Sequence, residues 1–316
     1  MTPKIYVNII GLISGFSIDK KYKLLNKEIY NEILLYELSK YWKNKYEKYL
    51  GDQKLSCIIL KGNYNWKYEF IRIINFDDWD LLNQRVDLIN LQELSLPEYG
   101  IKEIPKEIGN LINLDLLWLN NNEITKIPKE IENLINLQEL FLYNNRITKI
   151  PKEIGNFNKL QELWLNNNKI KEIPKEICNL KNLHSLYLNN NRITQIPNEI
   201  GNLINLRQLS IYKNGIKKIP RQIGNLINLN CLWLNNNEIK KIPKEIGKLI
   251  NLRQLSLENN FIKKVPREIE NLINLQELWL NNNIIQEIPK EIGSLTNLKQ
   301  YCYSQWKKLT KLSLKK

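Results

Sequence analysis

The side chains that could do chemistry are few and widely separated. The 316-residue chain has one histidine, His184, and four cysteines, Cys57, Cys178, Cys231 and Cys302, none of which is close to another in sequence. A single histidine excludes sites that need a histidine pair, and isolated cysteines form neither a zinc-binding pair nor a secreted disulfide framework. These residues predict no metal site, and they argue against thiol- or histidine-based catalysis.

Other catalytic motifs are also missing from the sequence. Gly247 and Lys248 are followed by leucine and lack the upstream glycine of a nucleotide-binding loop, so there is no cradle for phosphate. Glutamates recur at equivalent positions of a repeat described below, and equal surroundings do not separate two carboxyl pKa values as acid–base catalysis requires. The sequence therefore predicts that the protein is not an enzyme and uses no cofactor.

The composition is that of a folded chain, with 43% hydrophobic and 25% charged residues. The net charge of +14 is unevenly distributed: basic residues exceed acidic ones by four in residues 1–85, by four in residues 86–297 and by six in residues 298–316. The long middle is thus nearly neutral, and the short tail is densely basic. Alanine is absent while asparagine, isoleucine and lysine abound, which indicates an AT-rich genome.

A repeat of 23 residues fills most of the chain. Each unit reads LxxLxLxxNxIxxIPxxIgnLxn, so that Leu114 and Asn122 return as Leu137 and Asn145. We therefore assign residues 86–297 to one repeat domain. Its nine full units begin at Leu91, Leu114, Leu137, Leu160, Leu183, Leu206, Leu229, Leu252 and Leu275, and a tenth opens at Leu298 and loses the pattern by Tyr303.

Each unit predicts a short strand followed by a return arm. The leucines of LxxLxL alternate as in a strand with one buried face, and successive strands are expected to stack in parallel about 4.8 Å apart. The Ile-Pro step prevents a regular helix from beginning there and favours an extended arm. The asparagine after the strand is expected to turn inward and pair backbone groups that the turn leaves free. This predicts a buried ladder of Asn122, Asn145, Asn168, Asn191, Asn214, Asn237, Asn260 and Asn283, with Tyr99 in the first slot.

The two ends of the chain lack the period. Residues 27–49 have apolar residues at helical spacing, and residues 55–60 and 68–74 resemble strands, so residues 1–85 predict a small α+β cap or domain of open role. Residues 298–316 predict a partial repeat and a basic C-terminal cap. Residues 5–18 faintly resemble a secretory signal, but Asn8 and Gly11 interrupt the apolar run and no cleavage site follows.

The outer surface of the predicted sheet, the concave face of such a coil, is formed by the second, third, fifth, seventh and eighth residues of each unit. At the fifth position six of eight residues in units two to nine are aromatic, and Ser210 and Ser256 are the exceptions. Exposed rings favour an interface, although stacked rings could also only stiffen the sheet. We predict protein binding by Trp118, Phe141, Trp164, Tyr187, Trp233 and Trp279, with Tyr143, Tyr212, Arg207 and Arg253 beside them.

The charges of the concave face argue against nucleic acid as the partner. This face carries seven acidic residues but only three basic ones, Arg207, Lys213 and Arg253, whereas nucleic-acid binding needs several basic side chains against phosphates. Cys231 and His184 lie two units apart, roughly 10 Å along the sheet, which is too far for a nucleophile and its base. No stretch predicts a membrane span.

The 23-residue unit IPxxIGNLxNLxxLxLxxN resembles the leucine-rich repeat family, in particular the Ras-scaffold-like class that includes plant intracellular Ras-group-related proteins. The composition resembles that of a giant DNA virus such as mimivirus, or of another AT-rich microbe. The resemblance implies an α/β solenoid: a right-handed curved coil with a parallel concave sheet and extended or 3-10 convex arms. It also implies binding of other proteins along the concave face.

The sequence thus predicts a non-catalytic protein-interaction module in the cytoplasm, which would be the host cytoplasm for a viral protein. Two alternatives stay open. Residues 1–85 could recruit host machinery such as a ubiquitin ligase while the repeats select its substrate, or the protein could be a secreted effector. The oligomeric state is not predicted.

Overall fold

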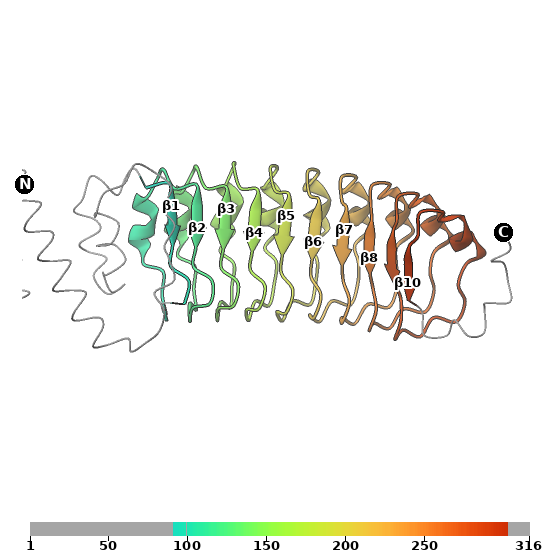
Figure 1. The fold of residues 1–316 in the computed structure, drawn as a ribbon. Coiled ribbons are helices and arrows are strands. Elements are labelled where there is room, and N and C mark those ends of the chain that lie inside the picture. Colours follow the sequence, from blue (N-terminus) through green and yellow to red (C-terminus); the bar gives the residue numbers. More distant parts are fainter. Residues whose placement is uncertain (1–90, 99, 303–316) are drawn as a thin grey trace, which may run out of the picture. The chain divides into compact units, whose positions relative to one another are not determined.

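The computed structural model describes residues 91–98 and 100–302, and within them ten three-residue strands pair in parallel and in chain order to form one sheet (Figure 1). The predicted N-terminal cap of residues 1–85, Tyr99 and the predicted cap beyond residue 302 lie outside the described residues. The strands are β1 (Glu93–Ser95), β2 (Leu116–Trp118), β3 (Glu139–Phe141), β4 (Glu162–Trp164), β5 (Ser185–Tyr187), β6 (Gln208–Ser210), β7 (Cys231–Trp233), β8 (Gln254–Ser256), β9 (Glu277–Trp279) and β10 (Gln300–Cys302).

Each return arm contains one short 3-10 helix that begins directly after the proline. Pro151, for example, is extended, with φ −67° and ψ 146°, and the helix starts at Lys152. The predicted parallel sheet with extended and 3-10 arms is therefore confirmed. The helices of the described residues are η4 (Lys106–Asn110), η5 (Lys129–Asn133), η6 (Lys152–Asn156), η7 (Lys175–Asn179), η8 (Asn198–Asn202), η9 (Arg221–Asn225), η10 (Lys244–Lys248), η11 (Arg267–Asn271) and η12 (Lys290–Ser294).

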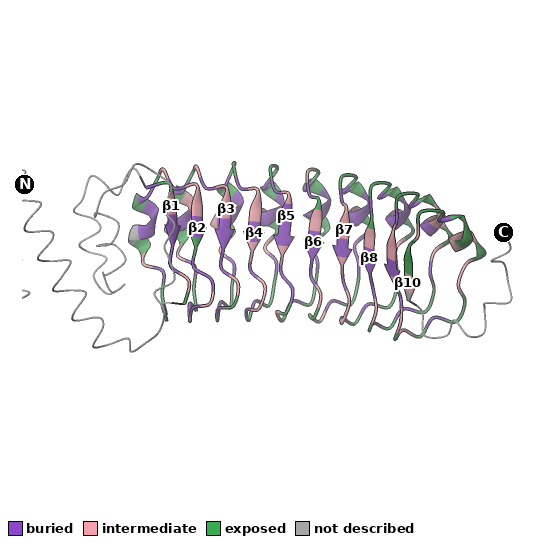
Figure 2. Cartoon of the chain, in the orientation of Figure 1, coloured by how far each residue is buried: buried purple, intermediate pink, exposed green. Residues whose placement is uncertain are grey.

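The leucines and isoleucines of the repeat form one continuous core between the sheet and the return arms. Leu117, Leu140 and Leu163 lie opposite one another in neighbouring strands and are fully buried. Figure 2 shows the same alternation of buried and exposed residues in unit after unit. Burying one such side chain contributes about 1.5–3 kcal/mol, so stacking of units supplies the main driving force for folding.

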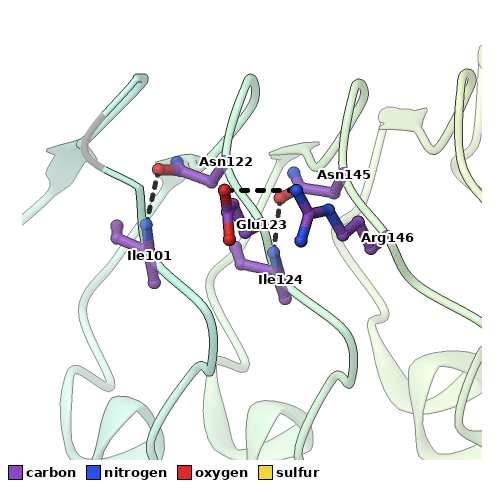
Figure 3. A network of polar contacts seen from close by, with 6 residues as sticks. All are labelled: Ile101, Asn122, Glu123, Ile124, Asn145 and Arg146. Atoms are coloured by element: carbon purple, nitrogen blue, oxygen red, sulfur yellow. Dashed lines mark hydrogen bonds and ion pairs between the residues drawn. The ribbon is translucent and has the colours of Figure 1, made fainter.

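The predicted asparagine ladder is confirmed and links each unit to the one before it. Oδ1 of Asn122 accepts a hydrogen bond from the backbone N–H of Ile101 at 3.0 Å (Figure 3). Its Nδ2 donates to the carbonyl oxygens of Leu96 and Leu119 at 2.8 and 3.0 Å. Asn145 accepts in the same way from Ile124 at 2.9 Å. Each amide therefore pairs buried backbone groups of two successive turns.

Two further asparagine ladders were not predicted. The residue before the ladder asparagine has a positive φ, which asparagine tolerates better than most residues, and these side chains bond in a row: Asn144 donates to Asn121, and Asn167 to Asn144, both at 2.5 Å. A third set precedes the first leucine of the unit, where Asn182 donates to the carbonyl oxygen of Asn158 at 2.6 Å. The signal for both was the recurrence of asparagine at these positions.

Glycines in the 3-10 helices allow neighbouring return arms to approach closely. A Cβ atom on Gly155 would lie 2.4 Å from the backbone oxygen of Glu176 in the next unit. Side-chain carbons do not come this close to backbone oxygens, so a larger residue requires the arms to separate. A Cβ atom on Gly293, in the last described helix, would have nothing within 4 Å of it.

We expect Gly155→Ala to lower the free energy of unfolding by about 1–3 kcal/mol, because the added methyl overpacks against fixed backbone. Gly293→Ala is the matched control: with open space around it, it should leave stability unchanged or raise it by about 0.4–1 kcal/mol. Urea unfolding followed by circular dichroism measures both. Equal midpoints for the two variants would show that close approach of the arms is not a constraint.

We expect Asn168→Ala to lower the free energy of unfolding by about 1–3 kcal/mol, because it leaves the buried N–H of Ile147 without a partner. The carbonyl oxygens of Leu142 and Leu165 each keep one bond, from Asn145 and Asn191. Asn168 donates to Leu142 and Leu165 at 2.9 and 3.1 Å and accepts from Ile147 at 2.9 Å. The same substitution at exposed Asn182 should cost less than about 1 kcal/mol, because water replaces its one bond. Thermal melting of both variants tests this, and a similar loss at the two sites would contradict it.

Candidate functional site

The structure places the predicted aromatic residues in one row across the concave face. Trp118, Phe141 and Trp164 are register partners in strands β2, β3 and β4, and Trp164 is in turn opposite Tyr187 in β5. The row continues through Ser210, Trp233, Ser256 and Trp279 in β6 to β9. Parallel pairing without a shift thus turns one repeat position into one continuous line of side chains.

The first half of the row packs against itself. Trp118 and Phe141 meet edge to face with ring centroids 5.4 Å apart, and Phe141 and Trp164 do the same at 5.2 Å. Such pairs contribute about 0.5–1.5 kcal/mol beyond the area they bury. Phe141 is only 8% exposed, whereas Trp118 is 40% exposed at the end of the row. Phe141 therefore acts largely as a structural ring, and the other rings offer more surface.

The second half of the row is interrupted by serine. Tyr187 and Trp233 lie two strands apart, about 9.6 Å by strand spacing, yet their ring centroids are 6.3 Å apart. The two rings therefore lean toward each other over Ser210, which is 1% exposed and donates a hydrogen bond to Oδ1 of Asn189 at 3.0 Å. The phenol of Tyr187 donates to Oε1 of Gln208. Serine thus opens space in the row while its own hydroxyl is satisfied.

A hollow of about 520 Å³ lies over this second half. Five rings line it, together with three asparagines, two serines and one carboxylate, all from the concave face of β4 to β9 and the residues just after these strands. They are Trp164, Tyr187, Tyr212, Trp233, Trp279, Asn166, Asn189, Asn235, Ser210, Ser256 and Glu258. Its size is in the range of small-molecule and peptide sites.

The hollow includes some of the predicted binding residues and leaves out others. Trp118 and Phe141 lie outside it, and Tyr143 packs on Trp164 with centroids 5.9 Å apart. Arg207 and Arg253 are exposed but are not among its lining residues. The predicted residues therefore share one face, but they divide into a self-packed group, a hollow and a basic rim.

Sequence reasoning missed the polar residues that complete the hollow. Asn166, Asn189 and Asn235 occupy the seventh position of their units, two residues after the aromatic position, and Glu258 occupies the same position in its unit. Ser256 donates to Oε2 of Glu258 at 2.5 Å. Comparing the fifth and seventh positions together would have indicated them, because both sets point outward from the same strands.

The row beside the rings includes four glutamates among uncharged residues, and they are Glu93, Glu139, Glu162 and Glu277. Glu139 and Glu162 are register partners, and Nε1 of Trp164 donates to Oε2 of Glu162 at 3.0 Å. Burial raises the pKa of Glu139 above its usual value, and the neighbouring charges of Glu162 and Glu93 raise it further. Burial likewise raises the pKa of Tyr187, and Glu162 adds to this effect. The field at this end of the face is therefore negative.

The surroundings of Cys178 and Cys231 do not favour their thiolate forms. Burial raises the pKa of Cys178 to about 12, with Glu199 and Glu176 adding to the shift. Burial and Glu277 raise the pKa of Cys231, while Arg253 lowers it. Nucleophilic cysteines need a lowered pKa, so neither thiol is activated.

Within residues 91–98 and 100–302, no three His, Cys, Asp or Glu side chains gather as metal ligands. In the same residues no helix is both long and apolar enough to cross a bilayer.

Comparisons with solved structures support the fold. The ectodomain of the Arabidopsis thaliana receptor kinase GASSHO1/SCHENGEN3, in complex with CASPARIAN STRIP INTEGRITY FACTOR 2, is 31% identical, with a TM-score of 0.59 over 66% of this chain and 30% of that one. The plant peptide hormone receptor RGFR1 in complex with RGF2 is 33% identical, with a TM-score of 0.58 over 69% of this chain and 40% of that one.

A bacterial protein has the same architecture. The functional domain of InlJ from Listeria monocytogenes, which includes a cysteine ladder, is 23% identical, with a TM-score of 0.60 over 68% of this chain and 44% of that one. This chain spans less than half the length of each of these three structures. No curated protein matches the sequence.

The family is shown by a sequence model as well as by structure. A model described as a leucine-rich repeat region matches residues 61–186, 129–213, 175–254 and 242–316, which together cover most of the chain. The Ras-scaffold-like class and the viral or microbial source stay predictions. With its 23-residue period, parallel sheet and asparagine ladder, the chain belongs to the leucine-rich repeat family.

Proposed function

We propose that this chain is a non-catalytic binding module that takes a protein or peptide partner on its concave face. The observation that carries the proposal is the row of half-buried rings that borders the hollow between Trp164 and Trp279. These rings keep apolar area that a partner can cover, and tryptophan, tyrosine and arginine dominate the energetics of interfaces. Exposed Arg207 and Arg253 are suited to selecting the partner from the rim.

The glutamates beside the rings support the same face. Burial raises the pKa of Glu139, and the charges of Glu162 and Glu93 raise it further, so the ionised carboxylate is unfavourable in the folded sheet. Gln208 and Gln254 occupy the equivalent place in other units, so an uncharged side chain fits there. Residues that break a local rule at a cost to stability are expected where a function uses them.

The structural relatives support a polypeptide as the ligand. The two plant receptors were solved as complexes with CASPARIAN STRIP INTEGRITY FACTOR 2 and RGF2, at 31% and 33% identity to this chain. Because this chain spans less than half of either structure, only binding is carried over, and no receptor activity is proposed.

The cytoplasm is the compartment that we favour, because Cys178 and Cys231 are free thiols, as is usual where the environment is reducing. Recruitment of host machinery by residues 1–85 stays a prediction, since these residues lie outside the described part of the chain.

Replacing Trp233 and Trp279 by serine should reduce partner capture at least tenfold, because interface aromatics contribute about 2 kcal/mol or more each. Serine already occupies this row at positions 210 and 256, so the fold should survive. The measurement is affinity capture from extracts of the native cells with quantitative mass spectrometry, after circular dichroism confirms folding. The matched control replaces Ile227 and Ile273, which are 52% and 60% exposed outside the concave face, by serine.

The control pair should capture the same proteins as the intact chain. Capture that survives the tryptophan double variant would move the binding site away from this half of the concave face. Loss of partner capture in both double variants would indicate non-specific binding by exposed apolar side chains, and not a binding site formed by the tryptophans.

Glu139→Gln should stabilise the protein at pH 7.5. The pKa of Glu139 is higher in the folded than in the unfolded state, so the ionised carboxylate is penalised on folding, and stability is lost as the pH rises through the folded pKa. The advantage of glutamine should shrink below about pH 4.3, the usual glutamate pKa, where both states are protonated. Urea midpoints of parent and variant at pH 7.5 and pH 4 test this, and a variant that is less stable at pH 7.5 would contradict it.

A further inference from the structure

Ser256 leaves a slot in the aromatic row between Trp233 and Trp279. Trp233 and Trp279 are register partners of Ser256 from the two sides, so their strands lie two spacings apart, about 9.6 Å. A flat group between two rings needs about 3.5–4 Å on each side, roughly 7–8 Å in all. The equivalent slot above Ser210 is closed to this use, because Tyr187 and Trp233 lean to 6.3 Å.

The slot carries a single formal charge, and it is negative. Of the eleven residues that line the hollow in the described chain, Glu258 is the only charged one. Its Oε2 accepts the hydrogen bond from Ser256 at 2.5 Å, which fixes the carboxylate beside the slot. Two carboxylate oxygens offer about four acceptor sites, so Glu258 has capacity for further donors.

The other polar side chains of the hollow are uncharged amides and hydroxyls, which both donate and accept hydrogen bonds. Oδ1 of Asn166, toward the Trp164 end, is buried without a hydrogen-bond partner in the described structure. Since this oxygen is buried, a ligand N–H would reach it only after its neighbours shift. Over the concave positions of β4 to β9 the charges balance in number, and of them only Glu258 lines the hollow; the others are Glu162, Glu277, Arg207, Lys213 and Arg253.

We infer that the hollow binds an extended, positively charged peptide segment of the partner, with one arginine or lysine side chain between Trp233 and Trp279 and against Glu258. This inference rests on the proposed function and adds the chemistry of the ligand. A cation over an indole face is attracted by the ring, and a guanidinium, being flat and rich in donors, fits both the rings and the carboxylate. From Trp164 to Trp279 the row spans five strand spacings, about 24 Å, which corresponds to roughly seven extended residues.

The test is selection of random twelve-residue peptides, displayed on phage, against the intact chain, followed by affinity measurement with the selected peptides made synthetically. Fluorescence polarisation then compares the intact chain with Glu258→Gln and with the Trp233→Ser, Trp279→Ser double variant. Glu172→Gln, an identical charge change at an exposed residue of a return arm, is the matched control. Glutamine keeps an acceptor for Ser256, so Glu258→Gln should fold.

We expect the selected peptides to share a basic residue. Their affinity should fall about five- to thirtyfold in Glu258→Gln and further in the tryptophan double variant, with no change in Glu172→Gln. Raising NaCl from 50 to 500 mM should weaken binding to the intact chain more than binding to Glu258→Gln, because salt screens the charge pair.

Two other results would contradict the inference of a cationic ligand, and they differ in whether they also contradict the proposed function. Peptides without a basic residue that depend on Trp233 and Trp279 but not on Glu258 would refute the cationic ligand and leave the proposed function intact. Peptides that bind all variants equally, or no enrichment at all, would refute the hollow as a peptide site together with the proposed function.

Discussion

The fold depends on how backbone polar groups are paired where each strand ends. Every strand of the described residues is only three residues long, and the chain leaves β1 to β9 through a residue with positive φ. Carbonyl oxygens such as that of Leu142 therefore face the interior without a strand partner. The ladder asparagine Asn168 reaches from the next unit to this oxygen at 2.9 Å. Because such a bond joins equivalent places in adjacent units, the amides hold every unit in the same alignment with its neighbours.

This alignment places equivalent residues of successive units next to one another along the whole coil. The result is favourable for leucine, for asparagine, which both donates and accepts, and for rings, as the contact of Phe141 with Trp164 illustrates. It is unfavourable for carboxylates, as at Glu139 and Glu162. In a row of identical rings, neighbouring rings cover one another's apolar surface. Ring surface therefore stays free for a ligand only where a small residue such as Ser256 interrupts the row.

The repeat made most of the fold predictable, since period, strand alternation and the inward asparagine all follow from residues such as Leu117 and Asn122. It also predicted which side chains share the concave face. It could not predict how rings fill the row, because the lean of Tyr187 over Ser210 depends on side-chain torsions and packing beyond backbone register. The role of Glu258 was missed for the same reason: its contact with Ser256 is set by local side-chain geometry.

Departures from the repeat carry more functional information than the repeat itself. Near-identical units arise by duplication, so recurrence of tryptophan at one position has a simple origin without any ligand. The two serines can also be explained by duplication, because Arg-Gln-Leu-Ser occurs at residues 207–210 and again at residues 253–256, as copying of a two-unit block would produce. Two residues after the serine, however, the blocks differ, with Tyr212 in one and Glu258 in the other. Duplication alone therefore does not explain Glu258. Its carboxylate lies beside the slot between Trp233 and Trp279, where a negative charge favours a positively charged ligand.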